Sequence, residues 1–134
     1  VRPDEASLIK KIQLHASDLQ LVIREEGKTP DLIVSGVVTE MKSRHPNGSL
    51  GVDLAKANVQ LLSHARRHGL AVGTGAVAVD LLRRSKVPVA EVLSTINNFA
   101  AANALGFSRV EVYAGARRRV FVRGKNGLFY LTRG

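Results

Sequence analysis

Hydrophobic residues recur at helical spacing from the N-terminus to about residue 105, and the first such stretch covers residues 4–26. Its apolar stripe consists of Leu8, Ile12, His15, Leu19, Val22 and Ile23. Most successive members are three or four residues apart, which predicts one face of a helix, and Gly27 follows as a C-terminal stop. Leu14 and Leu21 lie off this stripe, so an extended conformation for one part of the stretch stays open.

A second helix is predicted from Thr29, Pro30 and Asp31, which have the chemistry of a helix start. The threonine hydroxyl is a cap, proline fits the first helical position, and the aspartate carboxylate favours the positive end of the helix dipole. A His-Pro-Asn-Gly turn at residues 45–48 ends this helix. Its buried face is expected to contain Leu32, Ile33, Val37 and Met41.

Three further helices are predicted over residues 49–69, 74–85 and 88–105. Glycine follows or closes the first and third of them, and Pro88 begins the third. The inward-facing residues of this fifth helix are expected to be Val89, Val92, Leu93, Ile96, Phe99 and Ala100.

After residue 106 the spacing changes, because apolar and polar residues then alternate with period two. This alternation predicts three strands, over residues 109–114, 119–123 and 128–132. A Gly-Lys-Asn-Gly connection, residues 124–127, links the last two, and Asn-Gly in a short connection favours a hairpin.

These elements predict an α+β fold with about five helices followed by a C-terminal three-stranded antiparallel β-meander. The 134 residues, 45% of them hydrophobic, suit a single compact domain, 1–134, with a helical part (4–106) and a basic β-meander (107–134). A start at Val1 rather than methionine is compatible with a domain excised from a longer protein.

Composition removes several classes of protein and site. The chain has no cysteine, which excludes disulfides, thiolate metal sites and cysteine nucleophiles, and which fits a cytoplasmic location. No apolar run has the roughly 18 residues that a membrane helix needs, so we expect no membrane partner. We also expect no cofactor and no bound metal.

Charge is concentrated towards the C-terminus. The formal net charge is +9; residues 1–67 carry 10 basic and 8 acidic groups, whereas residues 68–134 carry 10 and 3. Within residues 107–134 alone, seven basic side chains face one acid, Glu111. Such a balance predicts attraction to a polyanion such as nucleic acid.

The basic side chains of the predicted meander are candidate phosphate ligands. Along a strand, Arg117, Arg119 and Arg123 share one face with Phe121, whose ring has the geometry to stack on an exposed base. The set of expected phosphate ligands is completed by Arg109, Arg118, Lys125 and Arg133. The competing interpretation is a solvated face, or arginines that protect an edge strand from aggregation.

The order helix, short break, helix and arginine-rich hairpin resembles the general layout of a winged helix–turn–helix domain, without a diagnostic motif. In that layout the second helix enters the major groove and the hairpin contacts the DNA backbone. The resemblance implies that Asn97 and Asn98 on the fifth helix face bases, since asparagine pairs with adenine. The absence of arginine and lysine from this helix, and its alanine content, favour close packing instead.

Catalytic and metal-binding patterns are weak. His64 and His68 have the spacing of a two-histidine metal pair, but no acid accompanies them and the neighbouring arginines repel a cation. The Gly-Thr-Gly segment at residues 73–75 begins a predicted helix, where backbone N–H groups can bind an anion, but it lacks the lysine of a phosphate-binding loop. No arrangement of serine, histidine and acid predicts a catalytic triad, so we expect a protein that is not an enzyme.

The sequence therefore predicts a non-enzymatic nucleic-acid-binding domain, with duplex DNA as the ligand, acting as a bacterial, phage or plasmid-type regulator of transcription or accessory factor. The alternative is a protein–protein interaction module whose basic sheet docks an acidic partner. Because Leu14 and Leu21 are apolar positions outside the main stripe, we also expect a homodimer.

Overall fold

Three helices are interspersed among the strands of the described chain, and these strands belong to one sheet. The computed structural model describes residues 3–14, 19–21, 32–43, 49–81, 88–114 and 117–133. In chain order the elements are α1 (Pro3–Gln13), β1 (Leu19–Leu21), β2 (Leu32–Val34), β3 (Val37–Ser43), α2 (Leu50–His68), β4 (Gly75–Asp80), α3 (Val89–Ala102), β5 (Phe107–Ala114), β6 (Arg117–Arg123) and β7 (Phe129–Arg133).

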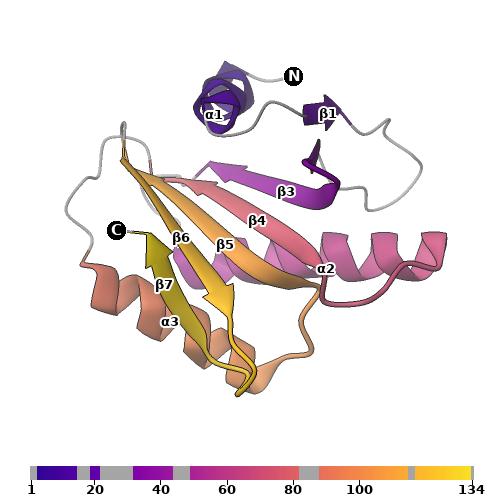
Figure 1. The fold of residues 1–134 in the computed structure, drawn as a ribbon, viewed down its shortest axis with the longest axis vertical. Helices are drawn as coiled ribbons and strands as arrows, with labels where there is room; N and C mark the ends of the chain where they lie inside the picture. Colours follow the sequence, from indigo (N-terminus) through magenta and orange to yellow (C-terminus); the bar gives the residue numbers. More distant parts are fainter. Residues whose placement is uncertain are drawn as a thin grey trace.

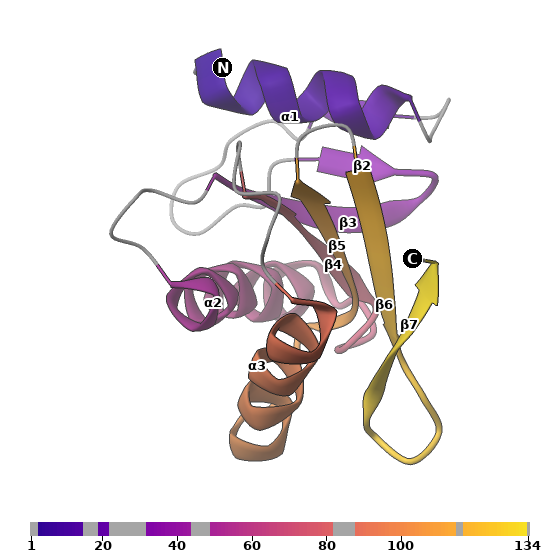
Figure 2. The same ribbon diagram turned by 90° about the vertical axis from the view of Figure 1, so that its left-hand side faces the viewer.

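The seven strands form a mixed sheet whose order follows the sequence, from β1 to β7 (Figure 1). The central strands β3, β4 and β5 are parallel, whereas β1–β2–β3 and β5–β6–β7 are antiparallel. Parallel neighbours need crossover connections, which here contain α2 between β3 and β4 and α3 between β4 and β5. Figure 2 shows α2 and α3 on one face of the sheet and α1 on the other.

The predicted fold class, about five helices followed by a three-stranded antiparallel meander, is therefore wrong. The described chain has three helices, and its sheet has seven strands. The three predicted C-terminal strands do occur, as β5, β6 and β7, but they are the edge of the larger sheet rather than a separate unit.

Each face of the sheet has its own hydrophobic core. Val77 and Val79 point to the face that α2 and α3 cover, whereas Ala78 between them points to α1. The α1 core consists of Leu8, Ile12, Leu32, Met41, Ala78 and Tyr113. Because the central strands are covered on both faces, all six residues of β4 are buried.

The second predicted helix is a β-hairpin. Val34 and Val37 are paired across a turn formed by Ser35 (φ 49°) and Gly36 (φ 81°). Two central residues with positive φ are typical of the tight turn whose twist matches a hairpin. The expected helix start, Thr29 to Asp31, lies outside the described residues.

The fourth predicted helix, residues 74–85, is wrong in its described part, where β4 runs from Gly75 to Asp80. A strand buried on both faces is a continuous apolar run, and such a run does not show the alternation that identifies a strand from sequence. Residues 82–85 of the prediction lie outside the described part of the chain.

The first predicted helix is shorter than expected. The helix α1 ends at Gln13, and residues 19–21 form the edge strand β1, so the extended conformation that Leu14 and Leu21 left open is present for one part of the stretch. Residues 15–18 and 22–31 are not described.

The predicted helices at residues 49–69 and 88–105 correspond to α2 and α3. The Ser49 hydroxyl caps α2 by accepting a hydrogen bond from Val52 N at 3.2 Å, and Gly69 ends it in the left-handed conformation (φ 63°). Here the capping residues define the helix ends locally, which is why the sequence predicts them.

A buried asparagine joins α2 to the connection between α3 and β5. Asn58 Nδ2 donates to Ala104 O at 2.8 Å, and Gly106 N donates to Asn58 Oδ1 at 2.6 Å.

A Cβ at Gly75 would lie 2.7 Å from Gly106 O, so glycine is required where β4 begins beside β5.

Candidate nucleic-acid interface

The arginine-rich strand β6 presents different residues to the two faces of the sheet. On one face of β6 lie Arg117, Arg119 and Arg123. Arg118 points to the opposite face, where it lines a pocket together with Ile12 of α1. Consecutive side chains of a strand point to opposite faces, so the run of three arginines is divided between two surfaces.

Phe121 belongs to the hydrophobic core. Its side chain is 0% exposed in the cluster that contains Phe107 and Phe129, although it shares a face with the flanking arginines as predicted. The ring stabilises packing between the sheet and α3 and has no free surface on which a base can stack. The predicted stacking role of Phe121 is therefore not supported.

The exposed cations of this region are Arg117, Arg123 and Lys125. Arg123 Nε donates to Gly127 O at 3.0 Å, which orders the β6–β7 turn that carries Lys125. Arg119 is half-buried and has an interaction of its own. Arg133 is the last residue of β7, and its side chain is not described.

The acids of residues 68–134 are mostly turned inward. Asp80 is 0% exposed and pairs with Lys11 Nζ at 3.1 Å, and Glu111 is 5% exposed and pairs with arginines. Of the three acids in this half, only Glu91 is an exposed residue. Among the described residues of this half, the exposed charges are therefore Arg117, Arg123 and Lys125 on the basic side and Glu91 on the acidic side.

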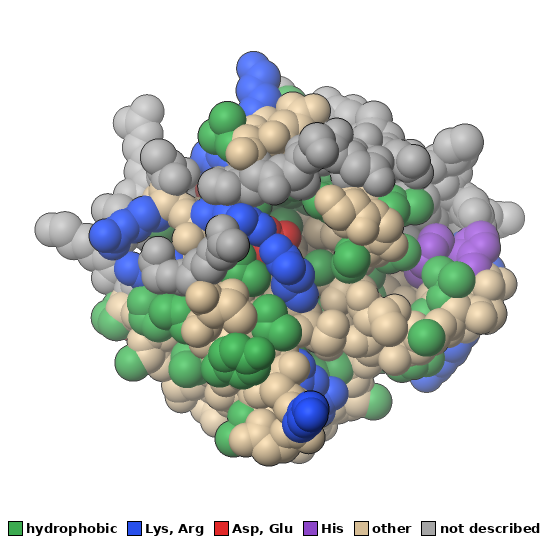
Figure 3. Space-filling model, viewed as in Figure 1, with side chains coloured by type: hydrophobic (Ala, Val, Ile, Leu, Met, Phe, Trp, Pro, Cys, Tyr) green, Lys and Arg blue, Asp and Glu red, His purple; other side chains and the backbone are tan. Residues whose placement is uncertain are grey.

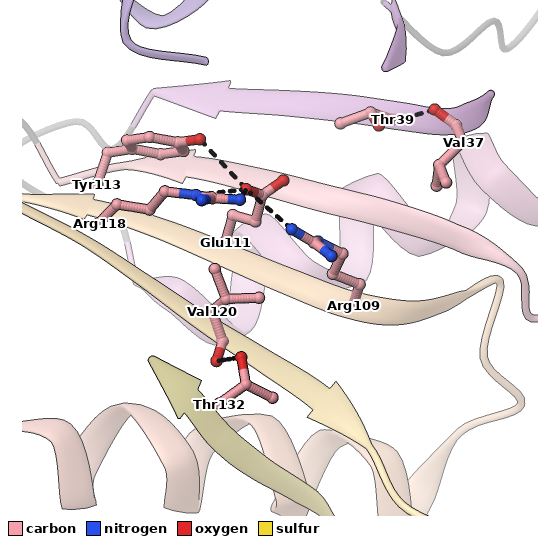
Figure 4. Close-up of polar contacts among 8 residues, drawn as sticks. All are labelled: Val37, Thr39, Arg109, Glu111, Tyr113, Arg118, Val120 and Thr132. Carbon is pink, nitrogen blue, oxygen red and sulfur yellow. Dashed lines mark hydrogen bonds and ion pairs between the residues drawn. The ribbon is translucent and has the colours of Figure 1, made fainter. Parts of the chain in front are cut away.

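Glu111 on β5 collects three donors on one carboxylate oxygen (Figure 4). Its Oε1 accepts from Arg118 Nε at 2.8 Å, from Arg118 Nη2 at 2.6 Å and from the Tyr113 hydroxyl at 3.3 Å. Arg109 Nη2 lies 3.6 Å from the same oxygen. Burial raises the pKa of the Tyr113 phenol, and the adjacent Glu111 carboxylate raises this pKa further, so Tyr113 remains a donor.

The predicted base-reading asparagines on α3 lie in different environments. Asn97 Oδ1 accepts from Phe129 N at 2.8 Å, and Asn97 Nδ2 donates to Phe129 O at 3.4 Å, so this side chain joins α3 to β7. Asn98 is exposed. Because α3 packs against the sheet as a crossover helix, the described chain does not have the winged helix–turn–helix layout or its groove-reading helix.

Sequence reasoning missed an ion pair on β3 between a buried glutamate and a half-buried lysine. Glu40 is 1% exposed, and Lys42 Nζ lies 3.1 Å from Glu40 Oε2. The two residues are separated by one position, so in a strand their side chains share a face. That face is the one covered by α2, since Val38 packs into the core of α2 and α3. The helical interpretation of residues 30–45 hid this pair, because on a helix the two residues do not share a face.

The two histidines of the predicted metal spacing lie side by side near the end of α2. The rings of His64 and His68 lie against each other with centroids 4.4 Å apart. Among the residues that the structure describes, no group of three or more His, Cys, Asp and Glu could hold a metal ion.

Comparison with protein-family models, curated proteins and solved structures gave no match. In the described ranges, no helix has both the length and the apolar character needed to cross a membrane.

Proposed function

We propose that this domain binds nucleic acid through the basic surface of its C-terminal half, with duplex DNA as the first ligand to test. The observation that carries the proposal is the arrangement of charge: Asp80 and Glu111 are buried and paired, whereas Arg117, Arg123 and Lys125 are exposed. Figure 3 shows one face of the molecule, where basic side chains lie next to the small acidic patch that is visible.

The mechanism is contact with the phosphate backbone. An arginine guanidinium can give two parallel hydrogen bonds to a phosphate, and each phosphate that is neutralised releases counterions. Backbone contacts fix the position of the protein but carry no sequence information. We therefore propose an accessory or regulatory role in which affinity falls steeply with salt and depends weakly on sequence.

The experiment replaces three exposed cations, Arg117, Arg123 and Lys125, by glutamine. We expect affinity for unrelated duplexes to fall uniformly, with the slope of log K against log salt reduced by about 0.9 for each phosphate that is no longer neutralised. The matched control replaces the exposed cations Lys10, Lys56 and Arg66 of α1 and α2, which changes the net charge equally.

Equal falls in affinity for the two triple variants would show that net charge alone causes the attraction. An unchanged affinity in the C-terminal variant would place the binding surface elsewhere. Binding to an acidic polypeptide but not to DNA or RNA would favour the competing proposal, a protein-interaction module for an acidic partner.

We propose in addition that the domain is a homodimer. Leu14, directly after α1, is 81% exposed, and contact with a second copy of the chain would cover it. Light scattering is expected to give the dimer mass for the wild type and a lower mass for Leu14→Gln. A monomer mass at high micromolar concentration would contradict this proposal.

A further inference from the structure

A small pocket lies on the α1 face of the sheet, between α1, the β2–β3 hairpin and β5. Its volume is about 160 Å³, and its lining includes Ile12, Ser35, Thr39, Arg109, Glu111 and Arg118. Pockets for drug-sized ligands have volumes of roughly 300–1,000 Å³, so this one suits a single small group.

The lining of this pocket has an excess of positive charge. Arg109 and Arg118 face one carboxylate, Glu111, so the three side chains together carry one positive charge. The Tyr113 hydroxyl donates a further hydrogen bond to Glu111 Oε1, the same oxygen that accepts from Arg118. With its negative charge shared among several donors, Glu111 opposes an incoming anion less than a free carboxylate does.

The two arginines differ in how firmly they are held. Arg118 gives both Nε and Nη2 to Glu111, and its side chain is 14% exposed. Arg109 has one longer contact, at 3.6 Å, and its side chain is 41% exposed. Arg118 is therefore a fixed part of the pocket wall, whereas Arg109 can turn its guanidinium towards a ligand.

We propose that this pocket binds one phosphate group, held by Arg109 and Arg118, with Glu111 as the residue that positions Arg118. Two guanidinium groups that line one small pocket can both donate hydrogen bonds to the tetrahedral oxygens of phosphate. The inference rests on the proposed nucleic-acid binding only for the source of the phosphate, which is a polynucleotide backbone.

The test follows the Nε–H resonances of arginine side chains by NMR while inorganic phosphate is added at constant ionic strength. We expect saturable shifts at Arg109 and Arg118. In Arg109→Ala, phosphate affinity should fall about tenfold, as expected for the removal of one charged hydrogen bond. Arg66→Ala, which changes an exposed arginine on α2, should leave it unchanged.

Glu111→Gln separates positioning from electrostatics. Removal of the carboxylate makes the pocket more positive, so a purely electrostatic role predicts tighter phosphate binding. The positioning role predicts weaker binding and a more mobile Arg118 side chain. Tighter binding with unchanged Arg118 dynamics would overturn the role assigned to Glu111, and Arg109→Ala tests the pocket independently of it.

A parallel titration with an oligonucleotide duplex and with a mononucleotide distinguishes the source of the phosphate. Steep, salt-dependent duplex binding that leaves Arg109 and Arg118 unperturbed would overturn the pocket and leave the proposed function intact. Saturable binding of phosphate and mononucleotide without duplex binding would overturn nucleic acid as the source and the proposed function with it. Duplex binding that is weakened by Arg109→Ala and not by Arg66→Ala supports both.

Discussion

Replacement of Asn97 by alanine is expected to destabilise the domain without changing any preference for DNA sequence. The side chain of Asn97 bonds both backbone groups of Phe129 and so joins α3 to the edge strand β7. Alanine leaves these two groups without their side-chain partner, while the helix itself tolerates alanine well.

The magnitude follows from the geometry of the two bonds. The hydrogen bond from Phe129 N at 2.8 Å is a good one, whereas the one to Phe129 O at 3.4 Å is long. Removal of one good bond and one weak bond at a partly buried site costs about 1–2 kcal/mol. For a domain of this size each kcal/mol lowers Tm by about 3–5 °C, so we expect a fall of roughly 3–10 °C.

Thermal unfolding by circular dichroism measures this effect, and Asn98→Ala is its matched control. Asn98 is exposed on the same helix, so its change to alanine should shift Tm by no more than about 2 °C, within the range for surface substitutions. Equal Tm values for the two variants would refute the structural role of Asn97. A selective decrease in affinity for one DNA site in Asn97→Ala would refute the placement of α3 away from bases.

Two further predictions concern burial and close packing. Burial raises the pKa of Tyr113, so above pH about 10 the unfolded state releases a proton that the folded state keeps. The free energy of unfolding should therefore fall as the pH rises from there, and it should fall less in Tyr113→Phe. Denaturant titrations at several pH values measure this difference. A slope that is identical in Tyr113→Phe would contradict this. Gly75→Ala should destabilise the domain by at least about 2 kcal/mol, because the new Cβ would lie 2.7 Å from Gly106 O. Gly51→Ala, which has open space around the new Cβ, should be neutral or stabilising. Calorimetry that ranks the two variants in the opposite order would show that β4 and β5 can separate.

Elements whose ends are defined by local chemistry could be predicted from sequence. The Ser49 cap and the Gly69 stop of α2 act within a few residues of the chain, and so does the Gly-Lys-Asn-Gly connection between β6 and β7. The spacing of apolar residues in α3 is informative because this helix is covered on one side only.

Elements in the middle of the sheet could not be predicted in this way. Burial of β4 on both faces removes the alternation that identifies strands, and the alternative of a helix then fits equally well. In the β2–β3 hairpin the informative signal is the Ser35–Gly36 pair between valines, since both residues have positive φ. The Thr-Pro-Asp sequence before it matches a helix start and so favours the wrong element.

The candidate site is only partly visible in the sequence. Alternation along β6 correctly places Arg117 and Arg123 on one face, but it cannot show that Phe121 on that face is in the core. Arg118 on β6 contacts Glu111 on the neighbouring strand β5, and this contact depends on the register between the two strands. Identification of the Glu40–Lys42 pair requires the correct assignment of β3 as a strand.

The salt dependence of duplex binding tests the central claim most directly. Titration of the wild-type protein with two unrelated duplexes, at two or more salt concentrations, measures the slope of log K against log salt. With three exposed cations on phosphates the account predicts a slope of about −2.7 or steeper, at about −0.9 for each neutralised phosphate, and similar affinities for the two sequences. A slope near zero, or no binding at low salt, would contradict the account.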